Sequence, residues 1–124
     1  MRQQRGVNKF VPAAVAIFFI VALGAVHVLS LDGLHGIALS VVFKPDTVFA
    51  AGYSPWKFRR VKLGMSRDEV KSLLGEPLSR ADAASSDEEY WYFSTSPSGA
   101  KYHIRVVQFA HGRVTRISSE FYVD

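Results

Sequence analysis

The sequence predicts an α+β fold: an N-terminal transmembrane helix, then a small domain of two helices and a three-stranded antiparallel β-meander. Three observations predict it. Residues 10–29 form an uninterrupted apolar segment, residues 66–77 carry matched helix start and stop signals, and residues 89–123 hold three β-prone runs separated by turns. The roughly 80 residues that follow the apolar segment are enough for one small core only.

The apolar segment is long enough to cross a bilayer. Residues 10–29 contain no formally charged side chain, and His27 is their only ionisable one. As a helix, about 20 residues reach roughly 30 Å, the thickness of the hydrocarbon core. We therefore expect residues 10–30 to be a membrane anchor. A cleaved signal peptide is the alternative, although signal peptides usually have a shorter apolar core, of roughly 7–15 residues.

The distribution of charge predicts the orientation of that anchor. The net charge is +4, of which Arg2, Arg5 and Lys9 supply +3, so the rest of the chain carries 4 − 3 = +1. Positive flanks stay in the cytoplasm. We expect residues 1–9 to be a cytoplasmic tail on a single-pass protein of the bacterial inner membrane, with a periplasmic or extracytoplasmic domain. The near-neutral remainder speaks against binding to nucleic acid.

Cysteine and histidine usage argues against covalent cross-links and metal sites. The chain has no cysteine, and therefore neither a disulfide nor the lipid-acceptor residue of a bacterial lipoprotein. Its four histidines show none of the short spacings of a metal site. The sequence predicts no metal and no cofactor.

Residues 31–54 are the hardest part of the chain to interpret. A second apolar run, residues 37–43, ends at the turn-forming triplet Lys44-Pro45-Asp46. This run is too short to cross a bilayer again. It is either a strand or an interfacial segment, and residues 31–54 are accordingly a linker or an interfacial segment.

The domain, residues 55–124, begins with two predicted helices. Ser54 and Pro55 are typical of a helix start, and we expect a short helix over residues 56–62. In the second helix, Ser66 and Glu69 are spaced for a capping box. The residues in and around this second helix form a sequence motif with a complete structural explanation. Its glycines shape the backbone, its apolar residues fill the core and its proline prevents the helix from continuing. Its members are Gly64, Met65, Ser66, Glu69, Val70, Leu74, Gly75 and Pro77.

A polar loop and three strands complete the prediction. Residues 80–88 are rich in Ala, Ser and Asp, as in a loop. Residues 89–95, 101–109 and 114–123 are aromatic or β-branched, with short turns between them. Short connections between consecutive strands favour an antiparallel meander.

These pieces together resemble a known family. The block VKLGMSRDEV…LLGEP, followed by the aromatic run YWYF and a strand, glycine turn and strand, is similar to the SmpA/OmlA (BamE-like) domain. The resemblance covers residues 53–123. It implies two helices and a three-stranded antiparallel sheet, a fold also found in a proteinaceous β-lactamase inhibitor. It also implies an envelope protein that works by binding other proteins; the best-known member is an outer-membrane lipoprotein of the β-barrel assembly machine.

Two regions carry the aromatic and arginine side chains that protein interfaces favour. One surrounds the first helix of the domain, where the alternative is that Trp56 and Phe58 are core residues beside solvated cations. The other is the first strand, whose alternation sends its two tyrosines to the face opposite Trp91 and Phe93. The candidate partner-binding residues are Trp56, Arg59, Arg60, Tyr90, Trp91 and Tyr92.

The sequence thus favours a non-catalytic adaptor or assembly factor that binds another envelope protein. No nucleophile elbow, phosphate loop or glycine fingerprint is present, so we expect neither an enzyme nor a small-molecule substrate. One alternative is a module that senses anionic membrane lipid through residues 37–43 and the cations Lys57, Arg59, Arg60 and Lys62. A second alternative, from fold analogy alone, is an inhibitor of an envelope enzyme.

Overall fold

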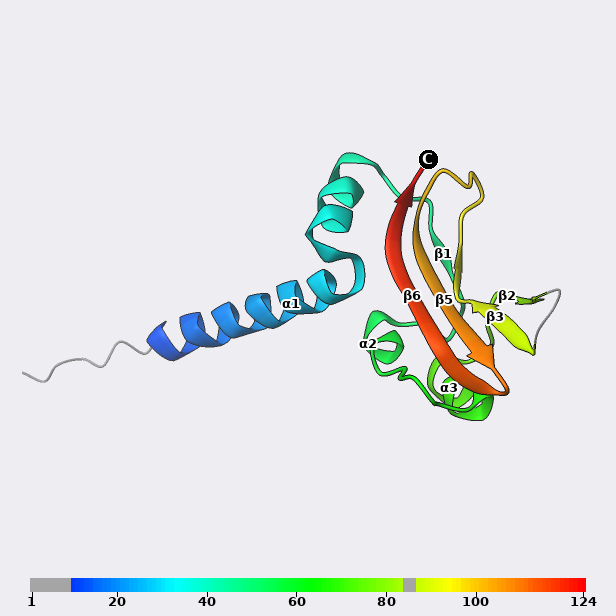
Figure 1. Cartoon of the computed structure of the whole chain (residues 1–124). Coiled ribbons are helices and arrows are strands. Elements are labelled where there is room, and N and C mark those ends of the chain that lie inside the picture. The colour runs from blue at the N-terminus through cyan, green and yellow to red at the C-terminus, as the bar shows by residue number, and fades with distance from the viewer. Residues whose placement is uncertain (1–9, 84–86) are drawn as a thin grey trace, which may run out of the picture.

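A bent N-terminal helix leads into a twisted antiparallel sheet with two short helices packed beside it (Figure 1). The computed structural model describes residues 10–83 and 87–124. The predicted tail, residues 1–9, and part of the predicted loop, residues 84–86, lie outside them. The elements are α1 Phe10–Val42, β1 Val48–Phe49, α2 Pro55–Phe58, α3 Arg67–Leu74, β2 Ser79–Asp82, β3 Glu88–Tyr92, β4 Ser94–Thr95, β5 Lys101–Ala110 and β6 Arg113–Val123.

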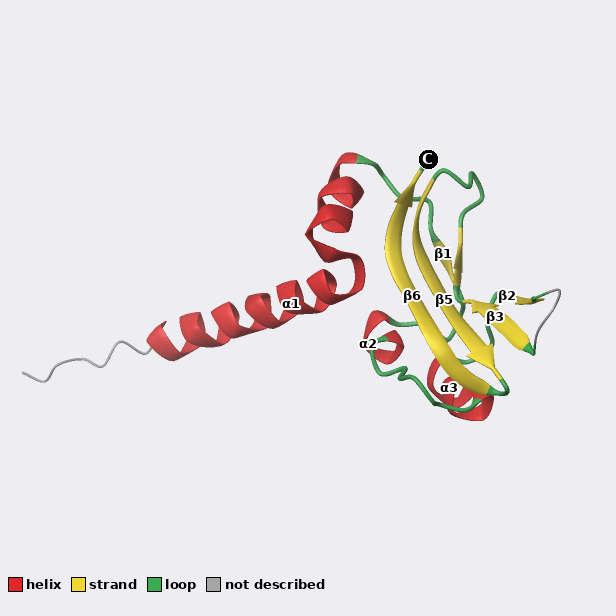
Figure 2. Cartoon of the chain, in the orientation of Figure 1, coloured by secondary structure: helices red, strands yellow, loops and turns green. Residues whose placement is uncertain are grey.

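The α+β class and the antiparallel pairing are as predicted, but the strand count is not. Four strands form the main sheet in the order β2-β3-β5-β6, and β1 pairs with β4 in a separate two-stranded sheet (Figure 2). The expected meander is β3, β5 and β6. The expectation of a loop from residue 80 was wrong, because residues 79–82 pair with β3. All four side chains of β2 are exposed, so this edge strand has no alternation of apolar and polar residues to reveal it.

The two faces of the sheet have different surroundings. Strand alternation puts Trp91, Phe93, Val107 and Phe109 on one face, where they form the core with apolar side chains of α2 and α3. We call this the covered face. Tyr90 and its neighbours on alternate positions point the other way, to what we call the open face.

The two short helices form where their capping signals predict. Ser54 caps α2, its hydroxyl accepting the Lys57 amide at 3.2 Å, although α2 ends at Phe58, earlier than expected. Ser66 and Glu69 make both hydrogen bonds of the capping box at the start of α3. Gly75, with φ 76°, ends α3.

The N-terminal helix is bent rather than straight. Its limbs, Ala13–His27 and Leu29–Val42, make an angle of 83°, and Gly33 has a non-helical backbone with φ 68°. Of the expected alternatives for residues 37–43, a strand is excluded because residues 37–42 belong to α1. The predicted anchor, residues 10–30, takes in the first limb and the start of the second. Within the described residues no single helix is long and apolar enough to cross a membrane, whereas the bent pair is, by length and composition alone.

Candidate functional site

The family motif is a structural unit, and its residues hold α3 against the sheet. Val70 and Leu74 are completely buried in the core. Gly64 and Met65 join the motif to β6, since the Gly64 amide donates to the Val114 carbonyl and the Val114 amide donates to the Met65 carbonyl. Backbone geometry and burial therefore account for these positions without any reactive chemistry.

The six predicted partner-binding residues do not form one surface. Trp91 is 2% exposed and belongs to the core, so any surface must be built without it. Its indole Nε1 donates to the Glu89 carboxylate at 2.6 Å, which satisfies the buried ring nitrogen. Tyr90 and Tyr92 lie on the open face, whereas Trp56, Arg59 and Arg60 lie around α2.

The open face has no helix against it anywhere in the described part of the chain. Strand register brings four tyrosines and two β-branched residues together on this face, across three neighbouring strands. Tyr102 and Tyr122 make an edge-to-face contact with ring centroids 5.7 Å apart. Most of the group is half-buried by strand neighbours, and Tyr122 is 39% exposed. The aromatic and apolar residues of the open face are Tyr90, Tyr92, Tyr102, Ile104, Val106 and Tyr122, and the polar residues Gln108, Arg116, Ser118 and Glu120 lie on the same face.

The region around α2 meets the end of the first limb of α1. The indole of Trp56 stacks on the His27 imidazole, with ring centroids 3.7 Å apart. Arg59 Nη1 lies 2.6 Å from His27 Nδ1. Arg59 and Arg60 also line an open groove of about 680 Å³ between α2 and α3, whose other wall carries Asp68 and Glu69. The groove thus contains charges of both signs.

A buried ionic network ties the second limb of α1 to the covered face. Arg105 of β5 is 2% exposed, and its Nη2 donates to the Asp32 carboxylate at 3.0 Å. Its other donors are also used, since Nε donates to the Tyr53 hydroxyl at 3.0 Å and Nη1 donates to the Ile104 carbonyl at 2.8 Å. The network therefore joins the bend of α1, the segment before α2 and the central sheet.

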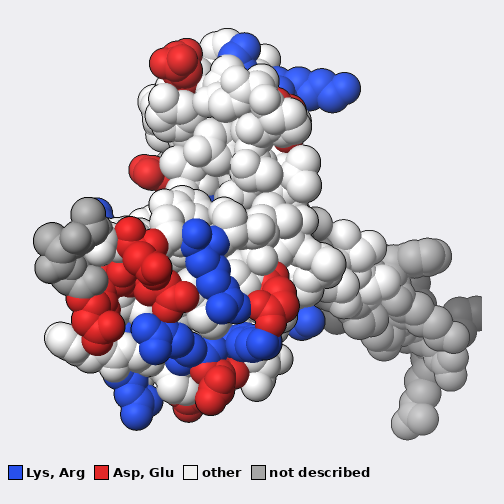
Figure 3. All heavy atoms as spheres, turned by 90° about the vertical axis from the view of Figure 1, so that its right-hand side faces the viewer, with Lys and Arg blue, Asp and Glu red and all other residues white. Residues whose placement is uncertain are grey.

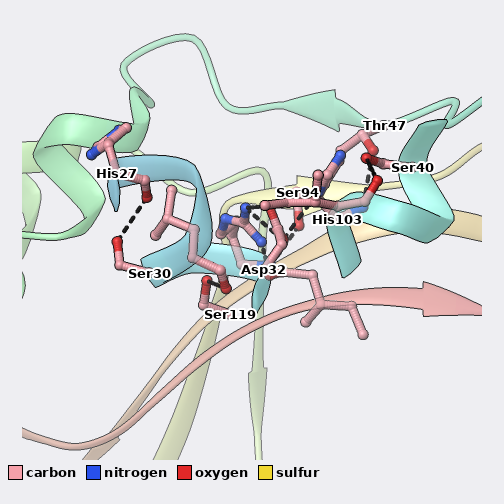
Figure 4. A network of polar contacts seen from close by, with 12 residues as sticks. His27, Ser30, Asp32, Ser40, Thr47, Ser94, His103 and Ser119 are labelled. Atoms are coloured by element: carbon pink, nitrogen blue, oxygen red, sulfur yellow. Dashed lines mark hydrogen bonds and ion pairs between the residues drawn. The ribbon is translucent and has the colours of Figure 1, made fainter. Parts of the chain in front are cut away.

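His103 completes the network on the Asp32 side, and Figure 4 shows the two side chains facing each other. His103 Nδ1 lies 3.1 Å from Asp32 Oδ1, and Arg105 Nη2 lies 3.0 Å from the same oxygen. His103 Nδ1 and Asp32 Oδ1 are both buried, and among the described residues they have no other partners than these. The tautomer with hydrogen on Nδ1 satisfies both atoms at once. Burial acts to raise the pKa of the Asp32 carboxyl, but the hydrogen bond from His103 and the charge of Arg105 outweigh it and hold that pKa below its ordinary value.

The backbone of the bend is satisfied by the sheet as well. A break in a helix leaves carbonyl groups without their usual amide partners. The Ser119 hydroxyl donates to one of them, the Leu31 carbonyl, at 2.7 Å (Figure 4). Gly36 lets the second limb approach β6 closely, because a Cβ added there would lie 3.1 Å from the Cβ of Phe121.

Sequence reasoning missed this network, although two signals were present. Asp32 is the single charged residue between residues 10 and 43. An acid in such a run costs free energy unless it has a partner. Arg105 carried a second signal, because strand alternation puts it on the same face as Val107 and Phe109.

The described residues present two surfaces to a partner, the open face and the region around α2. Within the described residues, no cluster of three or more His, Cys, Asp or Glu side chains could hold a metal ion. The side of the molecule seen in Figure 3 intermixes basic and acidic side chains instead of gathering the basic ones into a stripe.

Comparison with known proteins identifies the family of the domain. No curated protein sequence matches the chain. The family model described as the outer membrane protein assembly factor BamE domain matches residues 54–119, more than half of the 124 residues. This family consists of non-enzymatic assembly factors. The match begins at the cap of α2 and ends inside β6, so it takes in the family motif and most of the sheet. The chain therefore belongs to the BamE domain family, as its LGMS…LLGEP block and aromatic strand predict.

Proposed function

We propose that this chain is a non-catalytic adaptor of the bacterial envelope. Residues 10–29 would anchor it in the inner membrane, and its periplasmic domain would bind another envelope protein through the open face of the sheet. The observation that carries the proposal is the aromatic open face on a domain of an assembly-factor family. Aromatic side chains supply much of the binding free energy of protein interfaces.

The anchor is supported by the exposure of the first limb. Its large apolar side chains point outward, and Phe18 is 69% exposed. Such a helix is unfavourable in water and favourable in lipid, because every exposed apolar side chain is then removed from water. From Phe10, where α1 begins, to His27 the helix reaches roughly 27 Å at 1.5 Å per residue. This is a few ångströms less than the roughly 30 Å of an average hydrocarbon core, and local thinning of the bilayer accommodates such a difference. Arg2, Arg5 and Lys9 precede it and favour a cytoplasmic N-terminus.

The open face is a better partner surface than the region around α2. Trp56 and Arg59 already contact His27 at the end of the first limb. The charges of the neighbouring groove are also met by acids of α3. Tyr92 and Tyr122, by contrast, have no helix over them in the described residues and are free to enter an interface.

Site-specific photocrosslinking in native membranes tests the proposal. A benzophenone amino acid replaces Tyr92 or Tyr122 in the full-length chain, and the control position is Leu63, which is 68% exposed in the connection between α2 and α3. We expect one discrete protein adduct from the two open-face positions and none from Leu63. Tyr92→Ala and Tyr122→Ala should reduce capture of the same protein while circular dichroism stays unchanged.

Other outcomes would contradict the proposal. Adducts of equal yield from Leu63 would show that contact is unspecific. Lipid adducts alone, with no protein adduct from any position, would favour the lipid-sensing alternative over an adaptor.

A further inference from the structure

An apolar stripe runs along the second limb of α1. Leu34, Val41 and Val42 are 77%, 81% and 72% exposed, and Ala38 between them is exposed as well. Their spacing of i, i+4, i+7 and i+8 places them on one face of a helix. No charged residue lies between residues 33 and 43. A helix face of this composition is unusual on a surface that faces water.

The stripe lies on the side of the limb that points away from the sheet. Leu31 and Gly36, on the other side, are buried, and Gly36 packs against Phe121 of β6. Figure 1 shows the second limb standing beside β6, on the side from which the first limb leaves the domain. The stripe therefore looks toward the region that the first limb enters.

The angle between the two limbs of α1 determines how the second limb lies relative to the membrane. If the first limb runs along the membrane normal, an 83° bend brings the second limb almost into the plane of the membrane surface. An uncharged helix face in that position matches the interfacial helices that bury their apolar side at the boundary between head groups and acyl chains.

Trp56 lies beside the end of the first limb, where that limb would leave the bilayer. Its ring stacks on His27, which ends the first limb, and it is still 60% exposed. Tryptophan is enriched at this depth of a bilayer, where its ring is partly in the apolar region and its N–H is in contact with water. The exposed cations Lys57, Arg59 and Arg60 follow it directly and can reach head-group phosphates.

We propose that the stripe Leu34, Ala38, Val41 and Val42, together with Trp56, is a membrane-contacting surface that rests on the bilayer its own anchor crosses. This inference depends on the anchor in the proposed function and adds to it a fixed orientation of the domain. The second limb packs on the covered face, so the open face is turned away from the bilayer and toward a partner.

The absence of cysteine from the sequence makes a direct test possible. Single variants Leu34→Cys and Val41→Cys of the full-length chain are labelled with the fluorophore NBD and reconstituted into liposomes of phosphatidylethanolamine and phosphatidylglycerol. We expect blue-shifted emission and strong quenching by lipids that carry a spin label near the head group. Both positions are exposed, so the label does not disturb packing.

Two matched positions separate failure of this inference from failure of the anchor. Phe18→Cys reports the first limb, and Thr115→Cys reports an exposed residue of β6. Quenching at Phe18 by deep spin labels, with stripe emission as water-like as that of Thr115, would overturn the membrane-contacting surface and leave the anchor intact. Water-like emission at Phe18 would overturn the anchor itself. Stripe labels that are shielded but insensitive to spin-labelled lipid would assign the stripe to a protein neighbour, and that too overturns the inference.

Discussion

Removal of the Asp32 charge is the sharpest test of how the bent helix is held to the domain. Asp32→Asn keeps the size of the side chain but leaves Arg105 without its counterion. Arg105 would keep the Tyr53 hydroxyl and the Ile104 carbonyl as hydrogen-bond acceptors, and neither of these neutralises a charge. The substitution therefore removes the electrostatic part of the network with little change in its shape.

The size of the effect follows from burial. Breaking a buried ion pair by removal of one partner costs about 3–5 kcal/mol. Arg105 can avoid that cost if the second limb of α1 detaches and admits water. Detachment loses the burial of Leu31, about 1.5–3 kcal/mol, and the hydrogen bond from Ser119, about 1 kcal/mol. Leaving Arg105 buried without a counterion and detaching the second limb therefore cost similar amounts of free energy. We expect the docking of the limb to weaken by about 3 kcal/mol, which changes the equilibrium between docked and detached limb roughly a hundredfold.

Hydrogen exchange, measured by mass spectrometry on the reconstituted full-length protein, reports how firmly the second limb is docked. Protection of amides in residues 29–42 should fall by roughly that factor in Asp32→Asn, while β3 and β5 keep theirs. The control is Glu76→Gln, which removes an exposed carboxylate that pairs with Lys71 and Arg80. Exposed pairs contribute about 1 kcal/mol or less. Equal protection of residues 29–42 in the two variants would refute the reasoning.

Three further predictions concern the core, the packing of α3 and pH. Trp91→Ala should lower the free energy of unfolding by about 3–5 kcal/mol, since it empties a buried site, whereas Tyr90→Ala on the open face should cost far less; urea unfolding compares them. Gly52→Ala should destabilise by about 1–3 kcal/mol in the same assay, because its Cβ would lie 2.4 Å from the Leu74 carbonyl oxygen; a neutral result would mean that the backbone moves aside freely. Because the network lowers the pKa of Asp32, its contribution is fully present above the ordinary value of 3.8 and is lost as pH falls through the lowered value, so exchange in residues 29–42 should rise only at strongly acidic pH.

The parts of the fold that were predictable are those in which local signals are complete. Ser66 and Glu69 specify the start of α3 through their own hydrogen bonds, independently of the rest of the chain. Alternation along β3 separates Tyr90 from Trp91, and burial of Trp91 then identifies the open face. That last step required the structure, because alternation defines two faces without showing which one the helices cover.

The parts that were missed depend on contacts between distant residues. The strand β2 exists because β3 offers it an edge, and its own exposed side chains give no sign of this. The bend in α1 depends on Gly33, whose φ of 68° is unfavourable for other residues, and on Asp32 finding Arg105 seventy-three positions away. Hydropathy alone could not reveal the bend, because residues on both sides of it are apolar.

Strand β5 connects the two surfaces on which the proposed function depends. Arg105 holds the bend of α1 on the covered face, and its neighbours Ile104 and Val106 point to the open face. Adjacent residues of β5 therefore serve two contacts. Arg105 would hold the domain in place relative to its membrane, and Ile104 and Val106 belong to the face that would bind a partner. A domain on a flexible linker would lose orientational freedom on binding, and that loss weakens affinity. A domain already oriented by the Asp32 network has lost that freedom before the partner arrives, so weakening the network should lower partner capture even though no open-face residue has changed.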